Sequence, residues 1–504
     1  MRICLWHGWL LEGSGSNVYT ARVAESLVAD GHDVLLLCQE RHPERYPWIS
    51  AWGTVGSAGR PALASERPSG APGRCVLLRP EIGSLLPVFV IDEYEGFEVE
   101  RFLDLTDDEL EGYLQRNADA LREAVAWHGS EIVITGHAIP GGEIGRRALG
   151  AGGYVTKIHG SDIEYAIRPQ ERYRELARRG LTAARAVTGS SADALARCAE
   201  LVPGIEPLFR VVPPGVDAER FRPAPRREAL LGAAEQLDAD PDVARGRPSF
   251  LDAEVERALV ARDAAALGGL ALRYDQAVPD PHAATRLRAL AELSGPIVGS
   301  FGKFIPQKGV ELVLGAARIA TTRPTTLAVG FGLHREWLSA VALALAEGDL
   351  GALAWLGEES GTALELGAED LAGPAPAVVF TGRLDHRYAP EALAAMDVLV
   401  VPSILEEAFG MVAAEGAAAG ALPLVARHSG LAEVASALET EVRQPGLFSF
   451  EPGEGAVRRL AVGLDRLLSL PAEERAELQG AARGFVVREW SWRRTAERLL
   501  EAAS

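Results

Sequence analysis

Apolar runs alternate with amphipathic stretches along most of this chain. Near its start the apolar run RICLW is followed by the glycine- and serine-rich loop EGSGSN, the helical pattern VYTARVAESLVADG and a second apolar run, DVLLLC. A crossover of this kind joins two parallel strands, and its glycines stand where a backbone can approach a ligand at a helix N-terminus. The pattern predicts a strand, a loop, a helix and a second strand.

Similar units recur as far as about residue 220. Thr106 and Glu109 form a capping-box pattern that opens a helix reaching about His128. The runs EIVIT and GYVTKIHG then predict further strands. Residues 1–221 are therefore expected to form one doubly wound, Rossmann-like domain.

A second series of such units begins at Gly295. It comprises PIVGSFGKF, a helix in GVELVLGAARIAT, the runs TTLAVGFG and AVVFTGRL, a helix in APEALAAM, and the runs DVLVVPS and LPLVA. Residues 295–487 therefore predict a second Rossmann-like domain. Two such domains leave a cleft at the carboxyl ends of their strands, where ligands bind in sheets of this kind.

The remaining segments look helical. Residues 222–294 are rich in Arg, Ala, Asp and Leu at helical spacing and predict a helical insertion near the interdomain link, and residues 334–376 predict another. The amphipathic end FVVREWSWRRTAERLLEA predicts a C-terminal helix over residues 488–504 that packs back toward the N-terminal domain. The expected fold class is α/β, with two doubly wound domains facing across a cleft.

Composition narrows the functional classes. The chain has 504 residues, which is too many for a single hydrophobic core. Of these residues 48% are hydrophobic, a composition typical of globular and not of disordered proteins. Its formal net charge of -19 disfavours general binding to nucleic acid or to anionic membranes, because such binding needs clustered cations. We expect a globular protein without a nucleic-acid partner.

Cysteine usage and the N-terminus indicate a compartment. The cysteines lack C-x-x-C spacing, which argues against a zinc site and against a secreted disulfide framework: Cys4, Cys38, Cys75 and Cys198. The first apolar run is broken by His7 and Gly8, unlike the core of a signal peptide. No segment reaches the roughly 18 uncharged apolar residues that a membrane span needs. We expect a soluble, cytoplasmic protein.

Two acids, Glu407 and Glu415, stand in a run of small and apolar residues, EEAFGMVAAEGAAAGALPLVA. If all eight steps between them are helical they span about 12 Å, whereas paired catalytic carboxylates of glycosidases lie roughly 5 to 9.5 Å apart. The spacing favours contacts at opposite ends of one extended ligand. A helix beginning near Gly410 would turn its first N–H groups toward a phosphate. The alternative is a solvated helix edge.

The stretch PSILEEAFGMVAAEGAAAGALPLVARHSGLAEV resembles the E-x7-E segment of retaining GT-B nucleotide-sugar glycosyltransferases, glycosyltransferase family 4. Four further stretches resemble that family in its order: SGSNVYTARVAESLVADGHDV, TKIHGSDIE, VVPPGVDAERFRP and GSFGKFIPQKGVELVL. Together the five cover most of the chain outside the two insertions. The resemblance implies a GT-B fold with an N-terminal acceptor domain and a C-terminal donor-binding domain.

The resemblance also implies roles for single residues. Glu407 would hold hydroxyls of the donor sugar, and Glu415 those of the donor ribose. Lys303 and Lys308 match the family's cationic pair on the pyrophosphate, where fixed cations stabilise the departing diphosphate. His159 would lie near the donor sugar. The implied catalytic set is Glu407, His159, Lys303 and Lys308.

The resemblance further implies a donor-binding backbone. Gly15 would let the first loop approach the phosphates or the acceptor. Backbone amides would meet the sugar and the phosphates at four positions: Phe409, Gly410, Met411 and Val412. The structural alternatives are solvated loop lysines at positions 303 and 308 and, at position 159, a histidine at a strand end with its hydrogen bonds satisfied.

Three further candidates come from their positions after apolar runs. His7 and His137 follow such runs and are expected to line the acceptor side of the cleft. Arg383 follows VVFTG and is expected to border the base pocket.

The chain departs from the family pattern at four places: Ser14 and Lys303 replace the common Gly and Arg, and Ala408 and Pro214 replace Pro and Asn. None removes a charged contact. Lys303 lacks the bidentate fork of Arg, which predicts a looser or differently aimed grip on the phosphates.

Two weaker signals remain. Asp238–Asp240 has the D-x-D form that binds a metal and a diphosphate in another glycosyltransferase fold, but it lies in the helical insertion and is expected to be a loop or a helix cap. A basic segment could meet an anionic acceptor or a membrane surface, or form a solvated helix face paired with Glu171 and Glu175. Its members are Arg168, Arg172, Arg174, Arg178, Arg179 and Arg185.

The predicted function is retaining transfer of a hexosyl unit from a UDP- or GDP-sugar to an acceptor nucleophile, without a metal or another cofactor. The alternatives within enzymes are a GT-B phosphorylase and a nucleotide-sugar epimerase. From another class, the chain could be an inactive nucleotide-sugar-binding regulatory protein. The base, the sugar, the acceptor and the oligomeric state stay undetermined at this stage.

Overall fold

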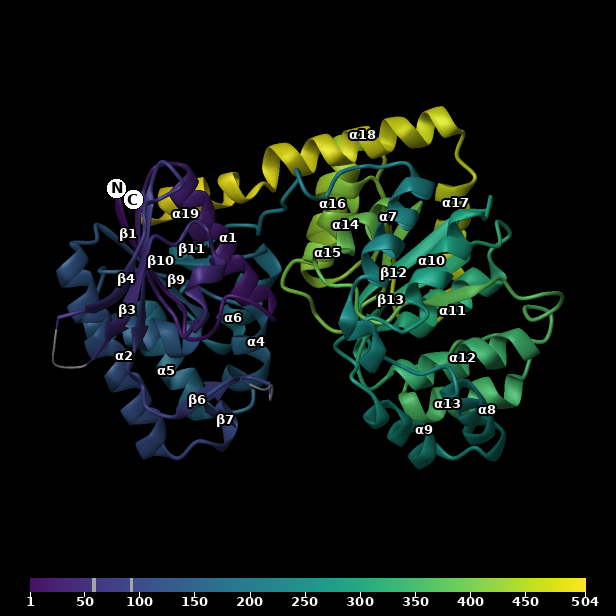
Figure 1. Cartoon of the computed structure of the whole chain (residues 1–504), viewed down its shortest axis with the longest axis horizontal. Helices are drawn as coiled ribbons and strands as arrows, with labels where there is room; N and C mark the ends of the chain where they lie inside the picture. Colours follow the sequence, from purple (N-terminus) through teal and green to yellow (C-terminus); the bar gives the residue numbers. More distant parts are fainter. Residues whose placement is uncertain (57–59, 91–93) are drawn as a thin grey trace. The chain divides into compact units, whose positions relative to one another are not determined.

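In a computed structural model, which describes residues 1–56, 60–90 and 94–504, the chain divides into two compact units (Figure 1). The N-terminal unit comprises Met1–Gly215 together with Trp490–Ser504. The C-terminal unit comprises Val216–Glu489. Each unit is built around its own sheet.

The sheet of the N-terminal unit has the strand order β11-β10-β9-β8-β1-β2-β5-β3-β4. Neighbouring strands are parallel except for β3 and β4, which pair antiparallel at one edge. Its strands are β1 (Arg2–Trp6), β2 (Asp33–Leu37), β3 (Ala51–Val55), β4 (Ala62–Glu66), β5 (Arg74–Pro80), β8 (Ile132–Gly136), β9 (Val155–Lys157), β10 (Ala186–Gly189) and β11 (Phe209–Val211). A separate parallel pair joins β6 (Leu85–Val88) and β7 (Glu98–Arg101).

Helices cover both faces of this sheet, which is why its central strands are mainly apolar. In β1, Ile3 and Leu5 join the core beneath α1 and α19, whereas Cys4 and Trp6 join the opposite core. This alternation follows from the two-residue period of a strand. The helices are α1 (Gly15–Ala29), α2 (Asp107–His128), α3 (Glu143–Leu149), α4 (Gly160–Asp162), α5 (Glu171–Thr182), α6 (Ala192–Leu201) and α19 (Trp492–Ala503).

The capping box predicted at the start of α2 is confirmed. The Thr106 side chain accepts a hydrogen bond from the Glu109 amide at 3.3 Å, and the Glu109 carboxylate accepts one from the Thr106 amide at 2.8 Å. The helix ends at His128 because Gly129 takes a left-handed conformation with φ of 68°.

The sheet of the C-terminal unit is wholly parallel, in the order β14-β13-β12-β15-β16-β17. Numbered along the unit, this is the 3-2-1-4-5-6 order of a Rossmann fold. Its strands are β12 (Ile297–Lys303), β13 (Thr325–Phe331), β14 (Val378–Phe380), β15 (Val398–Val401), β16 (Leu422–Ala426) and β17 (Ser449–Phe450).

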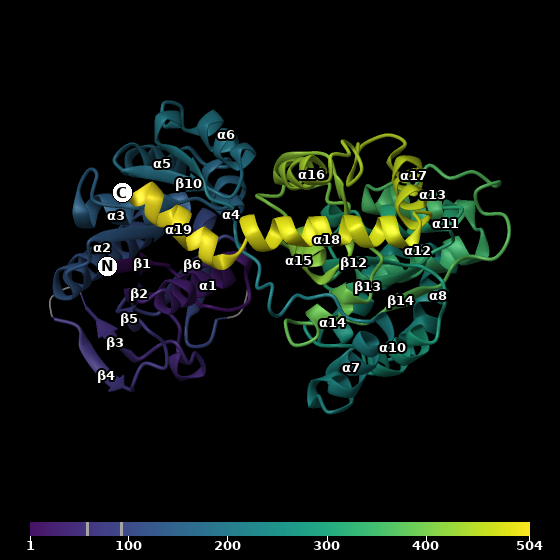
Figure 2. The same ribbon diagram turned by 90° about the horizontal axis from the view of Figure 1, so that it is seen from above.

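Residues 222–294 hold four helices and, in the part of the chain that the structure describes, no strand. Here α7 packs on α10 and α14, and α8 and α9 pack on α12. The helices of the C-terminal unit are α7 (Arg226–Asp238), α8 (Leu251–Ala261), α9 (Ala264–Leu270), α10 (Ala283–Ala291), α11 (Val310–Ile319), α12 (Arg335–Glu347), α13 (Leu350–Ser360), α14 (Ala389–Ala394), α15 (Met411–Ala419), α16 (Ser429–Val442), α17 (Ala456–Leu468) and α18 (Ala472–Glu489). Figure 2 shows α18 running beside α15 and α16.

The C-terminal segment differs from the single helix expected over residues 488–504. Helix α18 ends at Glu489, and α19 begins at Trp492 because Ser491 caps it, accepting a hydrogen bond from the Arg494 amide at 3.3 Å. Helix α19 packs on α1 in the N-terminal unit. The periodicity missed the break because an N-cap serine interrupts the helix without interrupting the amphipathic pattern.

Both sheets have a point at which the strand order reverses direction along the chain. In the N-terminal unit it lies between β1 and β8, and in the C-terminal unit between β12 and β15. Ligands of open parallel sheets bind outside the carboxyl ends of the strands at this switch point. Ligand binding is therefore expected at the loops that follow these four strands.

Candidate functional site

In the C-terminal unit, the loop after β15 forms an ion pair with the loop after β12. The Lys308 ammonium donates to Glu407 Oε1, and the buried Ser403 hydroxyl donates to the same oxygen at 2.7 Å. Lys308 and Glu407 keep 30% and 20% of their side-chain surface exposed, so a ligand can reach both. The structure thus brings together two residues that the sequence separates by ninety-nine positions.

Glu407 lies before the helix and not within it. Helix α15 begins at Met411, so the loop from Glu407 to Gly410 is not helical. The assumption of eight helical steps between Glu407 and Glu415 was therefore wrong, and the length derived from it does not hold. Glu415 stands in α15 and is half-buried.

A neighbouring turn fixes the backbone of this loop. The Glu407 amide donates to the Ser429 hydroxyl at 3.0 Å, and the Gly430 amide donates to the Glu407 carbonyl at 3.0 Å. A Cβ atom on Gly430 would lie 2.6 Å from the Ala408 carbonyl carbon, so only glycine permits this approach. Ser429 itself has a left-handed φ of 50°, a strained value of the kind found at functional sites.

Helix α15 presents an uncapped N-terminus next to Glu407. Gly410 is its N-cap, with φ of 94°, and in the ranges that the structure describes no side chain caps this end. The first N–H groups of a helix have no partner within it, and the helix dipole adds positive potential there. Met411 and Val412 are partly exposed, whereas Phe409 is buried and anchors the turn. This is a geometry suited to an anion.

Two more cations lie at the carboxyl ends of the adjacent strands. Lys303 ends β12 and is exposed, with its Nζ 5.8 Å from the centre of the Phe331 ring. The Arg383 guanidinium lies 5.0 Å from the centre of the same ring. Phe331 ends β13, so the two cations flank one aromatic side chain. Sequence analysis named Lys303 and Arg383 but missed Phe331.

In the N-terminal unit, the three histidines that the sequence singled out form one cluster. The His137 ring lies 4.4 Å from the His159 ring and 5.9 Å from the His7 ring, between centroids. Trp9 and Phe89 enclose His137 at 4.6 and 5.1 Å. Sequence reasoning had assigned His159 to the donor sugar and the other two to the acceptor, and it did not foresee their contact.

Burial keeps these histidines neutral. It lowers the pKa of His7 to about 4, although a hydrogen bond with Asn17 at 2.9 Å opposes the shift. It also lowers the pKa of His137 and of His159 well below the ordinary value, and the neighbouring histidines add to the effect. His137 has a left-handed φ of 70°. The cluster can therefore offer neutral imidazoles in a strained, fixed arrangement.

Residues that the sequence reasoning did not weigh complete this cluster. The Tyr19 ring meets the edges of His159 at 5.7 Å and of Trp492 at 5.8 Å. The Asp162 carboxylate accepts hydrogen bonds from the amides of Ala138 at 2.6 Å and His159 at 3.0 Å. Asp162 thereby holds together the loops that carry His137 and His159.

Gly15 is the first residue of α1, behind the N-cap Ser14. A Cβ atom at Gly15 would meet no atom of the described residues within 4 Å, and its φ is not left-handed. The fold of the N-terminal unit therefore does not itself require glycine at this position.

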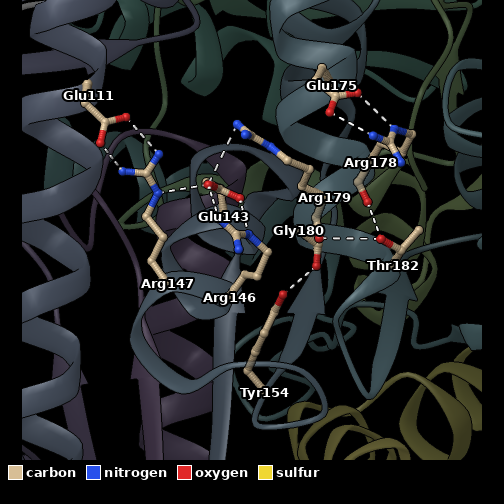
Figure 3. Close-up of polar contacts among 10 residues, drawn as sticks. All are labelled: Glu111, Glu143, Arg146, Arg147, Tyr154, Glu175, Arg178, Arg179, Gly180 and Thr182. Atoms are coloured by element: carbon tan, nitrogen blue, oxygen red, sulfur yellow. Dashed lines mark hydrogen bonds and ion pairs between the residues drawn. The ribbon is translucent and has the colours of Figure 1, made fainter.

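The arginine-rich segment is largely neutralised by carboxylates, and Figure 3 shows this pairing for Arg178 and Arg179. Arg174 and Arg178 pair with Glu171 and Glu175 at 2.5 and 2.8 Å, and the fully buried Glu143 pairs with arginines of α3. Burial alone would raise the pKa of Glu143, but hydrogen bonds from these arginines lower it. This pairing favours the solvated, ion-paired helix face. The other members bind Glu164, Asp107, Glu143 and the Ala503 carbonyl: Arg168, Arg172, Arg179 and Arg185.

The D-x-D stretch makes structural contacts. Asp238 pairs with Arg288, and Asp240 accepts hydrogen bonds from the Tyr388 hydroxyl at 2.7 Å and the Asp242 amide at 2.9 Å. These contacts fit the capping role that the sequence allowed. No group of three metal-ligating side chains occurs among the residues that the structure describes.

Comparison with protein families finds two matches that together cover most of the chain. Residues 288–485 match the family described as glycosyl transferases group 1. Residues 14–215 match the family described as glycosyl transferase 4-like domain.

A curated relative shares part of the sequence. It is the GDP-mannose-dependent monoacylated alpha-(1-6)-phosphatidylinositol monomannoside mannosyltransferase of Corynebacterium glutamicum, 27% identical over 237 residues. The match covers 45% of this chain and 52% of the relative, about half of its length.

Solved structures resemble the whole chain. Sucrose-phosphate synthase of Thermosynechococcus elongatus is 18% identical, with a TM-score of 0.54 and 100% of both chains covered. Anabaena HepE in complex with UDP and glucose is 14% identical, with a TM-score of 0.54 over 99% of this chain and 98% of that one. The catalytic domain of starch synthase IV of Arabidopsis thaliana, bound to ADP and acarbose, is 13% identical, with a TM-score of 0.56 over 100% and 98%.

These structural likenesses show the fold: two Rossmann-like units of the GT-B type, as the sequence predicted. In the described ranges, no helix has the length and apolar character that crossing a bilayer needs.

Proposed function

We propose that this chain, whose two units match glycosyltransferase domains, is a nucleotide-sugar glycosyltransferase. It transfers a hexosyl unit from a UDP- or GDP-sugar to an acceptor nucleophile, with retention of the anomeric configuration and without a metal. The C-terminal unit binds the donor, and the N-terminal unit binds the acceptor.

The observation that carries this proposal is the arrangement around Glu407. One carboxylate, one lysine and an uncapped helix N-terminus converge at the switch point of a Rossmann-like sheet. The cations and the helix end suit a diphosphate, and the carboxylate suits sugar hydroxyls as a hydrogen-bond acceptor. Lys303 and Arg383 add positive charge at the same carboxyl end of the sheet.

In the reaction, the bond between the sugar C1 and the diphosphate oxygen breaks, and a bond between C1 and the acceptor oxygen forms on the same face. The acceptor proton passes to the departing phosphate. Negative charge grows on that phosphate as the bond breaks. Lys308, Lys303 and the amides of Met411 and Val412 stabilise this charge, because they are in place before the charge develops.

Glu407 has a positioning role that fits its surroundings. Its Oε1 is already held by Lys308 and Ser403, so the remaining oxygen is the one available to sugar hydroxyls. The ion pair sets the carboxylate in one orientation before the donor arrives, which lowers the entropic cost of binding. Glu415 lies in the helix that begins beside the diphosphate and takes the ribose hydroxyls.

The identity of the donor is open between two classes of nucleotide. The curated relative is named for GDP-mannose, and one of the similar structures contains UDP. GDP-mannose and UDP-glucose are therefore the first donors to test. A phosphorylase would instead consume inorganic phosphate, and an epimerase would convert the donor without any acceptor.

The test is donor turnover by the purified 504-residue chain over a panel of UDP- and GDP-sugars, with and without phosphate and candidate acceptors. Release of the nucleoside diphosphate that increases with acceptor, and a product with the anomeric configuration of the donor, supports the proposal. An inverted product overturns retention. Binding of UDP or GDP without turnover of any donor overturns the enzymatic role.

A further inference from the structure

The chain contains only three lysines among its 51 Lys and Arg residues: Lys157, Lys303 and Lys308. Lysine and arginine are not interchangeable, because the lysine ammonium is a compact, titratable point charge and the guanidinium is a planar fork that stays charged. Lys303 and Lys308 lie at the proposed diphosphate site. Lys157 lies in the other unit, so its location raises a separate question.

Lys157 ends β9 in the N-terminal unit and is 2% exposed. Its Nζ donates to the Ser190 hydroxyl at 2.8 Å and lies 5.1 Å from the centre of the Tyr19 ring. Among the described residues no carboxylate forms an ion pair with it. Burying an ammonium without a counter-charge costs on the order of several kcal/mol, so such a group points to a function.

Two hydroxyl groups without described partners belong to residues that contact or face Lys157. In the parallel register of β9 and β10, Lys157 faces Thr188, so both side chains lie on the same face of the sheet. Both the Thr188 hydroxyl and the Tyr19 hydroxyl are buried, and no described group hydrogen-bonds to either. Ser190 directly precedes Ser191, the N-cap of α6, so a positive helix end is also near.

The charged and titratable neighbours do not satisfy the amine. Asp162 is a nearby carboxylate, but its oxygens accept backbone amides of Ala138, His159 and Ile163. His137 and His159 are held neutral by burial. Burial lowers the pKa of Lys157 to about 7, with Asp162 opposing the shift, so an arriving anion would favour proton uptake by the amine.

We propose that Lys157, Thr188, Ser190 and Tyr19 form a phosphate-binding niche that takes a phosphate group carried by the acceptor. The identification of the ligand as an acceptor rests on the proposed function. The phosphate-binding niche itself rests on the N-terminal unit alone. One ammonium and three hydroxyls are donors matched to the oxygens of a phosphate. The lysine niche, as we call these four residues, would make phosphorylated acceptors better substrates than neutral ones.

The test uses the 504-residue chain with lysine labelled by 13C at its ε-carbon, which gives one NMR signal for each of the three lysines. Lys157→Met and Lys157→Arg each identify the Lys157 signal, so assignment does not depend on one variant folding. The signal is followed from pH 5.5 to 10 with no addition, with inorganic phosphate, with acetate and with UDP or GDP. In phosphate, its titration midpoint should rise by about one pH unit or more.

Two conservative variants test whether the hydroxyls of Tyr19 and Thr188 bind the phosphate. Tyr19→Phe keeps the ring contacts with His159 and Trp492, and Thr188→Val keeps the side-chain shape. Each should weaken the phosphate response of Lys157 by roughly tenfold, because each removes a hydrogen bond to a charged group. Unchanged phosphate affinity in both variants overturns the proposal, as does a Lys157 signal that phosphate does not move or that only acetate moves.

The nucleotide arm distinguishes the sources of phosphate. Lys157 responding more tightly to UDP or GDP than to phosphate assigns the niche to the donor and overturns the acceptor assignment. Responses of Lys303 and Lys308 to nucleoside diphosphate test the proposed function separately. If Lys157 responds to phosphate and Lys303 and Lys308 do not respond to nucleoside diphosphate, the niche is supported and the donor site is rejected. If only Lys303 and Lys308 respond, the niche is rejected and the donor site is supported.

Discussion

The two switch points have the same topology and opposite chemistry. In the C-terminal unit, Lys303, Lys308 and the N-terminus of α15 present positive charge on partly exposed loops. In the N-terminal unit, His7 and His137 are almost fully buried among aromatic rings and held neutral.

This difference shows that the Rossmann-like strand order determines where a ligand binds but not which ligand binds there. Fixed, accessible cations suit the strongly charged diphosphate. A buried cluster of neutral imidazoles suits hydroxyl groups, and the adjoining Lys157 is the one lysine in the sequence of this unit. The two units therefore suit different substrates, and the following predictions are ways to break that assignment.

The largest expected effect is on turnover through Lys308. Lys308→Met removes a fixed charge that stabilises the departing diphosphate, and the rate constant of transfer should fall by about 100- to 1,000-fold. The control is Glu477→Gln, a change at an exposed position of α18 that should leave the rate unaltered. Steady-state assays with the best donor measure both. Transfer at the wild-type rate in Lys308→Met would remove the C-terminal switch point from the mechanism.

The next effect concerns the turn that supports Glu407. Gly430→Ala places a Cβ atom 2.6 Å from the Ala408 carbonyl carbon, so the two loops must separate. We expect the free energy of unfolding to fall by about 1–3 kcal/mol, together with weaker donor binding. Urea unfolding and calorimetry measure the two quantities. A fully stable variant with unchanged donor affinity would show that this turn does not position Glu407.

A pH effect comes from the N-terminal unit. Because burial lowers the pKa of Lys157 to about 7, the folded chain releases a proton that the unfolded chain keeps up to about pH 10.5. Below pH 7 both states are protonated and the cost of burying the charge is complete. The free energy of unfolding should therefore rise between pH 7 and 9, by up to about 1.4 kcal/mol per pH unit relative to Lys157→Met.

Urea unfolding at pH 6, 7, 8 and 9 measures this difference. Tryptophan fluorescence reports mainly on the N-terminal unit, which holds seven of the nine tryptophans. A pH-independent difference between the two proteins would mean that Lys157 keeps an ordinary pKa.

The smallest expected effect on stability is at Gly15. Gly15→Ala places its methyl group in open space at the start of α1, and the free energy of unfolding should change by less than about 0.5 kcal/mol. Turnover should nevertheless fall if a ligand approaches this backbone closely. Thermal unfolding and donor turnover of one variant separate the two effects. Full turnover would place the ligand elsewhere on the N-terminal unit.

Much of the fold could be predicted from the sequence because both sheets are parallel and buried on both faces. Continuous apolar runs such as those of β1, β2 and β15 identified the strands. The edge of the first sheet gave no such signal. All residues of β4, Ala62–Glu66, are exposed, so neither an apolar run nor an alternating pattern marks it.

The candidate site could be predicted only in part. Glu407, Lys308 and Lys303 were identified by resemblance, but Ser403, Ser429 and Phe331 were not, because their roles depend on loops far apart in sequence. Lys157 lies within the stretch TKIHGSDIE, but no role was predicted for it, although the sequence contains only three lysines. Burial of a polar side chain is a tertiary property, which periodicity does not reveal.

The central claim is that the C-terminal switch point binds the nucleoside diphosphate. Isothermal calorimetry of UDP and GDP with the wild type, Lys308→Met and Arg178→Gln tests it most directly, since Arg178→Gln removes one exposed, ion-paired cation from the N-terminal unit. The account predicts that Lys308→Met weakens the preferred nucleotide by at least about tenfold and that Arg178→Gln binds it like the wild type. Equal affinity for the nucleotide in Lys308→Met and the wild type would contradict the account.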